Sequence, residues 1–454
     1  MSEKKRKLFG TDGVRGLANR HPITAGMALK LGRAIGYRLR EKHRRPKVLI
    51  GKDTRLSGYM IETALASGLV SVGADVHLCG PLPTPGIAFL TAGMRCDAGV
   101  VISASHNPYE DNGIKLFARD GYKLPDAEEL ALEELLESTE LADFRPTGTD
   151  IGRAFRIDDA AGRYSVFAKG AFPKACTLDD FKIVVDCAHG AAYRVAPEVL
   201  HELGAEIVAL GDTPDGTNIN AGFGALHPDV AARAVVESGA QVGIALDGDA
   251  DRCILIDETG TVVDGDQLLA LLGRRMIRQG ELVDQTLVAT VMSNLGLERS
   301  MREAGGRVVR VAVGDRYVVE RMRADGLNLG GEQSGHVILH DHATTGDGLV
   351  TALAVLGAMV EEGAKLSELA ACMTRYPQVL QNVAVGSKPP LETLDAVQAA
   401  ISAVERELGR DGRVLVRYSG TQNLARVMVE GPEQGFIERA AQRIAGALEA
   451  AVGG

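Results

Sequence analysis

The sequence contains no long apolar run. No stretch approaches the roughly 18 consecutive apolar residues that a helix needs to cross a bilayer. The basic residues at positions 4 to 7 lead into Phe9-Gly10-Thr11-Asp12 with no apolar core behind them. We therefore expect neither a secretory signal nor a membrane anchor. The sequence predicts a protein of the cytoplasm with no membrane partner.

A basic excess and cysteine motifs are also missing. Lysine and arginine number 50 against 60 aspartates and glutamates, so the formal net charge is −10. This balance argues against a general nucleic-acid binder, because such a protein needs a basic face. The six cysteines form no C-x-x-C pair and show no metal-ligand spacing. They indicate small core residues in a reducing compartment, and any anionic ligand must be held by a local arrangement of residues.

A repeated order of strands and helices organises the first four fifths of the chain. A strand, a helix, a glycine turn, a second strand and a third strand recur three times, with first strands near 48–51, 183–186 and 287–290. Strands that alternate with helices predict related α/β domains, and 454 residues are too many for one core. From about Tyr376 the pattern changes to a strand, a helix, an antiparallel pair around residues 418–423 and a final helix.

The predicted fold class is therefore α/β. We expect three tandem related α/β domains with mixed sheets and a smaller C-terminal α+β domain, arranged around a central cleft. The predicted ranges are a first domain over 1–155, a metal-binding domain over 156–256, a sugar-binding domain over 257–372 and a phosphate-binding domain over 373–454.

The third strand of each α/β repeat ends in a polar loop. These loops are Ser103–His106, Asp247–Arg252 and Gly331–His336. In open α/β sheets ligands bind beside the carboxyl ends of strands, so three loops in equivalent positions can form the walls of one shared site.

The first loop makes Ser105 a candidate nucleophile, with His106 and Lys115 close in sequence. Earlier in the chain, the glycine-punctuated segment from Phe9 to Gly16 carries Arg15, which can clamp a phosphate. The alternatives are a polar turn after a buried strand and a surface turn with an exposed arginine.

The second loop places Asp247, Asp249 and Asp251 at alternate positions. In an extended segment these side chains point to one side, and their charges repel unless a cation lies between them. A magnesium ion shared with a phosphate fits such a set of oxygens. A calcium loop of the EF-hand type fails at its sixth position, where the sharp turn needs glycine and this chain has Arg252. A solvated acidic turn is the other alternative.

Two further loops carry ligand-binding chemistry. Glu332 and Ser334 alternate and can grip vicinal sugar hydroxyls, with Asp315 shortly before them; the alternative is a capped turn. The C-terminal loop has the parts of a phosphate cradle, although a hairpin turn rich in serine and glycine has a similar composition. The donors in that cradle are Arg417, Ser419, Gly420, Thr421 and Arg426.

These loops, in this order, resemble the α-D-phosphohexomutase superfamily over essentially the whole chain. The form Gly-Glu-Gln-Ser-Gly-His and the opening Phe-Gly-Thr-Asp-Gly-Val-Arg-Gly resemble the branch that acts on glucosamine phosphates. The resemblance implies one Mg²⁺ per chain and a phosphoserine at Ser105, whose phosphate binds that ion together with the three aspartates. It also implies sugar phosphates as ligands, with Arg252 and His336 among the residues that bind them.

The implied reaction transfers the phosphoryl group of Ser105 to glucosamine 6-phosphate. The bisphosphate then turns in the crevice and returns its other phosphate to the serine, so that glucosamine 1-phosphate leaves for amino-sugar nucleotide and cell-wall precursor synthesis. Arg15 and Lys115 stabilise charge in this scheme. Either Lys115 or His106 moves the hydroxyl proton, and a homodimer is one assembly that the sequence leaves open.

One position departs from the family pattern, because Gln422-Asn423 replaces the usual Glu-Pro of the phosphate loop. This change puts the stiffness of the loop and its sugar preference in doubt. The alternatives for the whole chain are a phosphomannomutase or phosphoglucomutase of the same fold, a metal-dependent sugar phosphatase, and a sensor that binds sugar phosphates without converting them.

Overall fold

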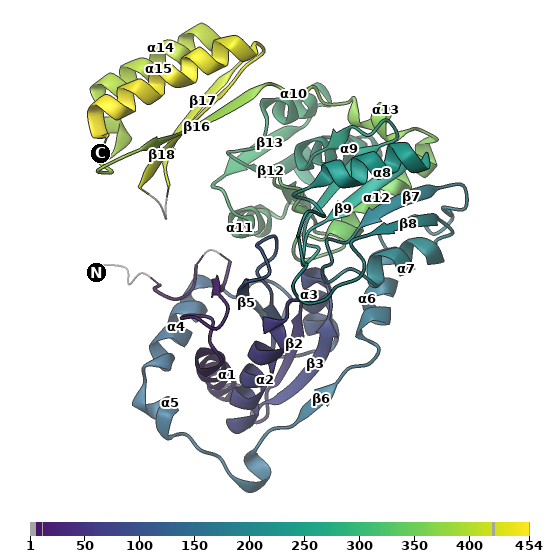
Figure 1. Ribbon diagram of the computed structural model, residues 1–454, viewed down its shortest axis with the longest axis vertical. Coiled ribbons are helices and arrows are strands. Elements are labelled where there is room, and N and C mark those ends of the chain that lie inside the picture. Colours follow the sequence, from purple (N-terminus) through teal and green to yellow (C-terminus); the bar gives the residue numbers. More distant parts are fainter. Residues whose placement is uncertain (1–5, 11, 420–422, 454) are drawn as a thin grey trace.

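A computed structural model describes residues 6–10, 12–419 and 423–453. Figure 1 shows four bodies in chain order, from the N-terminal domain at the bottom to the C-terminal domain at the upper left. Among the described residues, no helix is both long and apolar enough to cross a membrane.

The first domain is a six-stranded mixed sheet in the order β1-β5-β4-β2-β3-β6. Its strands are β1 Val14–Leu17, β2 Lys47–Lys52, β3 Asp75–Pro81, β4 Ala98–Ile102, β5 Asp111–Ala118 and β6 Ala154–Arg156. Its helices are α1 Ala25–Arg40, α2 Ser57–Ser71, α3 Thr84–Gly93, α4 Asp126–Leu136 and α5 Thr139–Asp143, with a 3₁₀ turn at Gly148–Asp150.

Side chains alternate across β2, so the strand contributes to two cores. Val48 and Ile50 belong to an apolar cluster with residues of α1 and α2. Leu49 belongs to another cluster, which contains residues of α3. Thr24 caps the start of helix α1, because its side chain accepts a hydrogen bond from the Met27 amide at 3.2 Å.

The second and third sheets have the orders β11-β10-β9-β7-β8 and β13-β12-β14-β15. The second contains β7 Lys182–Asp186, β8 Glu206–Leu210, β9 Val242–Leu246, β10 Cys253–Asp257 and β11 Val262–Val263. The third contains β12 Thr286–Thr290, β13 Arg307–Val311, β14 Leu329–Gly331 and β15 Val337–Leu339. The helices along this part are α6 Ala160–Lys169, α7 Val195–Glu202, α8 Pro228–Ser238, α9 Gly265–Gln279, α10 Leu295–Glu303, α11 Asp315–Asp325, α12 Gly348–Glu362 and α13 Leu366–Ala370, with a 3₁₀ turn at Val283–Gln285.

The three sheets share one strand pattern. In each, the first strand (β2, β7 or β12) lies between the second and the third and runs parallel to both. An antiparallel strand (β5, β10 or β15) follows and pairs with the third. The predicted threefold repeat with mixed sheets is confirmed. The second sheet includes β11, so its strands extend beyond residue 256.

The three α/β domains share an apolar core. One cluster contains Leu49 and Phe117 from the first sheet, Leu246 from the second, and Leu287 and Leu329 from the third. Because burial of apolar surface is the dominant favourable term in packing, this shared core holds the strand-end loops of the three domains at fixed relative positions.

The C-terminal domain has a separate apolar cluster and an all-antiparallel sheet in the order β16-β18-β17. Its elements are β16 Gln378–Ala384, α14 Asp395–Leu408, β17 Arg413–Tyr418, β18 Leu424–Glu430 and α15 Gln434–Val452. A 3₁₀ turn at Leu391–Thr393 precedes α14 and is separated from it by Leu394, which has a non-helical ψ of 83°. In Figure 1, α14 and α15 lie together on one face of this sheet.

Candidate active site

Ser105 lies just past the end of β4, buried, with a positive φ of 52°. Its Oγ donates a hydrogen bond to Asp247 Oδ2 at 2.6 Å and lies 3.3 Å from His106 Nδ1. Its backbone amide donates to Ser103 Oγ at 2.9 Å. The candidate nucleophile therefore faces the aspartate loop of the second domain, from which it is separated by 142 positions in sequence.

Arg55, which was not among the predicted site residues, holds the serine loop. The side chain is fully buried. Its Nε donates to Asp53 Oδ2 at 2.8 Å, and Asp53 Oδ2 also accepts from Ser103 Oγ at 2.6 Å. The remaining guanidinium donors contact the carbonyl oxygens of Ser105, Asn107, Pro108 and Asp111. The signal in the sequence is a polar run directly after the buried strand β2, at the same sheet edge as the serine.

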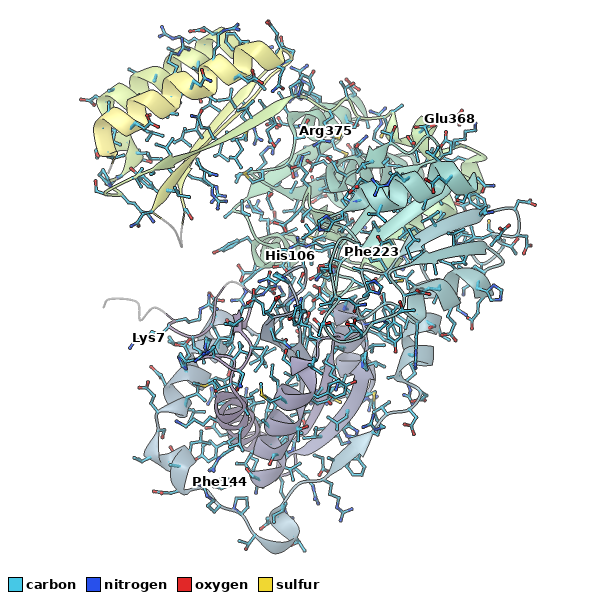
Figure 2. All side chains as sticks on the ribbon, viewed as in Figure 1. Lys7, His106, Phe144, Phe223, Glu368 and Arg375 are labelled. Atoms are coloured by element: carbon cyan, nitrogen blue, oxygen red, sulfur yellow. The ribbon has the colours of Figure 1, made fainter. Side chains whose placement is uncertain are left out.

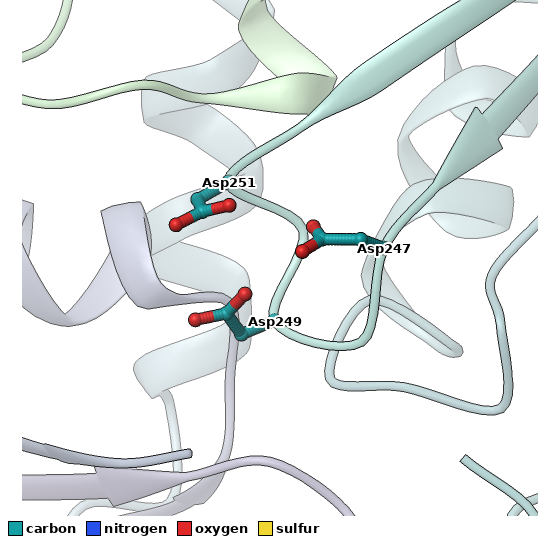
Figure 3. Close-up of side chains that lie close together, drawn as sticks. All are labelled: Asp247, Asp249 and Asp251. Carbon is teal, nitrogen blue, oxygen red and sulfur yellow. The ribbon is translucent and has the colours of Figure 1, made fainter. Parts of the chain in front are cut away.

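Asp247, Asp249 and Asp251 form a compact, buried carboxylate cluster (Figure 3). One ligand oxygen from each lies within 4.8 Å of the others. The segment is a turn in which Ala250 has a φ of 56°, so the extended conformation inferred from the spacing is wrong although the side chains do converge. Convergence comes from the turn bringing the three carboxylates to one side.

The cluster fits a divalent cation. Within the described ranges, Asp249 Oδ1 and Asp251 Oδ1 are buried without a hydrogen-bond partner. Burial, and then the carboxylates of Asp251 and Asp249, raise the pKa of Asp247 well above its usual value. Three buried carboxylates that repel one another and have oxygens to spare match the hard oxygen ligands that Mg²⁺ prefers.

Lys115 on β5 supplies a buried positive charge beside the cluster. Its Nζ lies 2.9 Å from Asp249 Oδ2, 3.2 Å from Asp12 Oδ2 and 3.5 Å from Asp251 Oδ2. Burial disfavours the charge, but these carboxylates outweigh burial and raise the pKa of Lys115 above its usual value. Asp12 was not predicted as a site residue; it also pairs with Arg15 and Lys123.

Two other neighbours complete the surroundings of the serine. The Thr84 hydroxyl, also not a predicted site group, donates to Asp249 Oδ2 at 2.7 Å. Burial, and then the charges of Arg252 and Arg15, lower the pKa of His106 to about 4. The imidazole is therefore neutral near pH 7 and can accept a proton, whereas protonated Lys115 can only donate one.

A cavity of about 430 Å³ opens beside these groups. Figure 2 shows His106 in this region, where the first domain meets the second and third. The lining includes seven predicted site residues, namely Arg15, His106, Asp251, Arg252, Asp315, Glu332 and His336, together with Asp12. The three α/β domains therefore share one cavity, as the strand-end loops predicted.

Two of the three residues predicted as ligands in the third-domain loop, Glu332 and His336, line this cavity. Glu332 Oε1 accepts a hydrogen bond from the Gly314 amide at 3.1 Å and lines the cavity. His336 Nδ1 lies 3.7 Å from Asp251 Oδ1; burial disfavours the charge, but Asp251, Asp315 and Glu332 outweigh burial and raise the pKa of His336. Ser334 is exposed and is not among the lining residues.

The predicted phosphate cradle lies in the C-terminal domain. Arg417 and Arg426 are directly opposite each other on β17 and β18, and Ser419 is buried at the end of β17. Burial, and then the charge of Arg426, lower the pKa of Arg417. Two adjacent guanidinium groups repel each other, which an anion would relieve. Gly420 and Thr421 lie outside the described residues. In the view of Figure 1, the β17–β18 hairpin points toward the first domain.

Four family models match the chain in order. They are the phosphoglucomutase/phosphomannomutase alpha/beta/alpha domains I, II and III, at residues 6–143, 167–260 and 264–376, and the C-terminal domain of the same family at residues 380–447.

Curated relatives match over almost the full length. A phosphoglucosamine mutase of Anaeromyxobacter sp. (strain Fw109-5) is 62% identical over 99% of this chain and 96% of its own. A phosphoglucosamine mutase of Syntrophotalea carbinolica is 57% identical, with coverage of 99% and 98%.

Solved structures share the fold. A phosphoglucomutase/phosphomannomutase family protein from Burkholderia thailandensis has a TM-score of 0.82 at 25% identity, over 98% of this chain and 97% of its own. Aspergillus fumigatus N-acetylphosphoglucosamine mutase, in complex with GlcNAc-6P and magnesium, has a TM-score of 0.68 at 18% identity, over 99% and 96%.

Proposed function

Because the chain belongs to the phosphoglucomutase/phosphomannomutase family, we propose that it is an isomerase that interconverts glucosamine 6-phosphate and glucosamine 1-phosphate. The observation that carries the proposal is the 2.6 Å hydrogen bond from Ser105 Oγ to Asp247, inside a buried carboxylate cluster that fits a divalent cation. Relatives named for this activity over nearly the whole chain support the choice of sugar.

Ser105 carries the transferred phosphoryl group in the proposed reaction. A phosphoserine adds about −1.5 to −2 charges at pH 7 beside three carboxylates, so it needs cations close by. Lys115 and Arg15 belong to this site and supply two of them. Asp247, Asp249 and Asp251 would hold Mg²⁺ together with the phosphate, and the ion would neutralise charge as the phosphoryl group moves.

The phosphoryl group leaves Ser105 Oγ for the free hydroxyl of the sugar phosphate, and that hydroxyl loses its proton. His106 is the proposed carrier of this proton, because its neutral ring lies 3.3 Å from Ser105 Oγ and lines the cavity. It takes the proton from the sugar hydroxyl and passes it to Ser105 Oγ as the phosphoryl group leaves. The bisphosphate then turns over and returns its other phosphoryl group to Ser105 Oγ, and the serine proton passes through His106 to the departing sugar oxygen. Phosphoryl transfer depends mainly on positioning and charge stabilisation, which these buried groups provide.

Sugar recognition belongs to the cavity residues contributed by the third domain. Glu332, Asp315 and His336 line the cavity and present carboxylate and imidazole groups to a polyol, with Arg252 beside them. Ser334 stays a prediction, as do Arg417, Ser419, Gly420, Thr421 and Arg426 as the grip on the non-reacting phosphate. The domain ranges 1–155, 156–256, 257–372 and 373–454 stay part of the same proposal.

We place the reaction in the cytoplasm, where its product feeds amino-sugar nucleotide and cell-wall precursor synthesis. The six cysteines, all within the described residues, carry free thiols, which is typical of a reducing compartment. A homodimer stays a prediction.

A comparison of substrates tests the proposal. The purified protein with Mg²⁺ and a sugar 1,6-bisphosphate primer is assayed on glucosamine 6-phosphate, mannose 6-phosphate and glucose 6-phosphate, with Ser105→Ala as the inactive control. We expect the highest kcat/KM on glucosamine 6-phosphate and a phosphate on the peptide that contains Ser105 by mass spectrometry. A higher kcat/KM on mannose or glucose phosphate would overturn the sugar assignment, and free phosphate released as fast as substrate is consumed would identify a phosphatase.

A further inference from the structure

Two side chains from different domains bind the same pair of carbonyl oxygens in the serine loop. Asn220 Nδ2 donates to Ser105 O at 2.9 Å and to Asn107 O at 3.0 Å. Arg55 Nη2 donates to the same two oxygens at 2.9 Å and 2.7 Å. Arg55 belongs to the first domain with the serine, whereas Asn220 belongs to the second domain, between β8 and α8.

Asn220 is itself held in place. It is buried, its backbone has a φ of 60°, and its amide donates to Ala188 O at 2.8 Å. Asparagine tolerates this left-handed conformation better than most residues. The side-chain amide is therefore presented from a fixed backbone, and its two donor hydrogens face two acceptors of the neighbouring domain.

Arg55 and Asn220 together form a clamp on the serine loop, and this clamp lies against the aspartate loop. A Cβ placed on Gly248 would lie 2.6 Å from Ser105 O and 2.8 Å from Asn220 Nδ2, so only glycine fits there without a shift. Gly248 O also accepts a hydrogen bond from the Ala191 amide at 2.8 Å. The Ser105 carbonyl, the Asn220 amide and the turn that carries Asp247 and Asp249 are therefore in direct contact.

Ser105 needs such restraint. A non-glycine residue with a positive φ of 52° occupies a sparsely populated conformation that persists only where its surroundings impose it. The peptide planes on either side set the direction of the Cα–Cβ bond and hence the position of Oγ. A misplacement of about 1 Å at a reacting atom can cost about 100-fold in rate.

We propose that Asn220 is a positioning residue that sets the direction of the Ser105 side chain relative to the aspartate loop, and so controls the rate of phosphoryl transfer. Arg55 holds the loop to its own domain, whereas Asn220 fixes the position of the loop relative to the domain that carries Asp247. Asn220 acts through the Ser105 backbone and is not a lining residue of the substrate cavity. The inference rests on the proposed mutase reaction.

Two substitutions and one matched control test the role. Asn220→Gly removes the amide and keeps a backbone that accepts a positive φ. Asn220→Asp keeps the shape but presents an acceptor to two carbonyl oxygens. Asn218→Gly is the control, because Asn218 lies in the same loop and its side chain bonds, within the described structure, to Asp215 N and Thr213 O of that loop.

We expect both Asn220 variants to lower kcat by about 10- to 100-fold, with KM and the Mg²⁺ concentration for half-maximal rate within about twofold of native. Single-turnover phosphorylation of Ser105 from a sugar 1,6-bisphosphate should slow by the same factor, while Asn218→Gly stays close to native. Hydrogen exchange of the peptide covering residues 103–111 should accelerate in Asn220→Gly and not in the control.

Three results would overturn the inference. They are a kcat of Asn220→Gly equal to that of Asn218→Gly, a rise in KM at unchanged kcat, and unchanged hydrogen exchange over residues 103–111. The exchange measurement tests the clamp even where the native protein shows no mutase turnover, so failure of this inference is distinguishable from failure of the proposed function.

Discussion

Replacement of Arg55 by lysine should loosen the serine loop without unfolding the protein. Arg55 is fully buried, and its donors reach the carbonyl oxygens of Ser105, Asn107, Pro108 and Asp111 as well as the Asp53 carboxylate. Lysine keeps the positive charge beside Asp53 but loses the planar fork that serves several acceptors at once. The substitution therefore isolates hydrogen bonding from charge.

The size of the effect follows from which carbonyls lose a partner. Ser105 O and Asn107 O keep the amide of Asn220, and Pro108 O keeps the Asp111 amide at 3.2 Å, whereas Asp111 O loses the guanidinium. A buried polar group left without a partner costs about 1–3 kcal/mol. A lysine ammonium that stays beside Asp53 leaves Asp111 O without a donor, so we expect local opening of the loop to become easier by about 1–3 kcal/mol.

Hydrogen exchange measured by mass spectrometry reads this change directly. Since about 1.4 kcal/mol corresponds to a factor of ten, exchange over residues 103–111 should accelerate by about 5- to 150-fold. Arg45→Lys is the matched control, because Arg45 also contacts an aspartate and a carbonyl oxygen of the first domain but is solvent-exposed. We expect kcat to fall in Arg55→Lys and to stay near native in Arg45→Lys.

Exchange within threefold of native over residues 103–111 would refute the reasoning. Acceleration of the same size in peptides of the C-terminal domain would also refute it, because that pattern indicates global destabilisation and not the loss of local hydrogen bonds to the serine loop.

Three further outcomes are expected. Chelation of divalent cations should abolish turnover, and Mg²⁺ should restore it. Mg²⁺ at about 100 times its Kd should also stabilise the native protein by about 2.7 kcal/mol in thermal unfolding. The Asp249→Asn variant should lose this stabilisation. Arg316→Met should destabilise the protein by about 2–4 kcal/mol in calorimetry, because Arg316 pairs with buried Glu129 across the first and third domains at 3.0 Å and, among the described residues, Arg6 is the ion-pair partner that remains; an unchanged Tm would contradict this. Burial raises the pKa of Asp347 to about 6, so the folded protein binds more protons than the unfolded chain between about pH 4 and 6, and the free energy of unfolding falls as pH rises through that window. Asp347→Asn removes this term, so its stability relative to native should improve by up to about 2 kcal/mol between pH 4.5 and 7.5, and a pH-independent difference would contradict the assignment.

The sequence by itself determined the elements and the chemistry carried at their ends. Period-two and helical patterns located the three strand repeats and the C-terminal domain, because these periodicities follow from local backbone geometry. The polar loops after the third strands identified Ser105 and the three aspartates, since such loops share one sheet edge in every repeat.

The tertiary structure decided which distant groups meet. Ser105 and Asp247 are 142 residues apart, and their 2.6 Å contact exists because a shared apolar core fixes three domains against one another. The same packing creates the Arg55 and Asn220 clamp, places Lys115 among three carboxylates and leaves Ser334 exposed. No local pattern encodes these contacts, because each depends on long-range burial that brings charges and carbonyl groups from separate loops into one desolvated site.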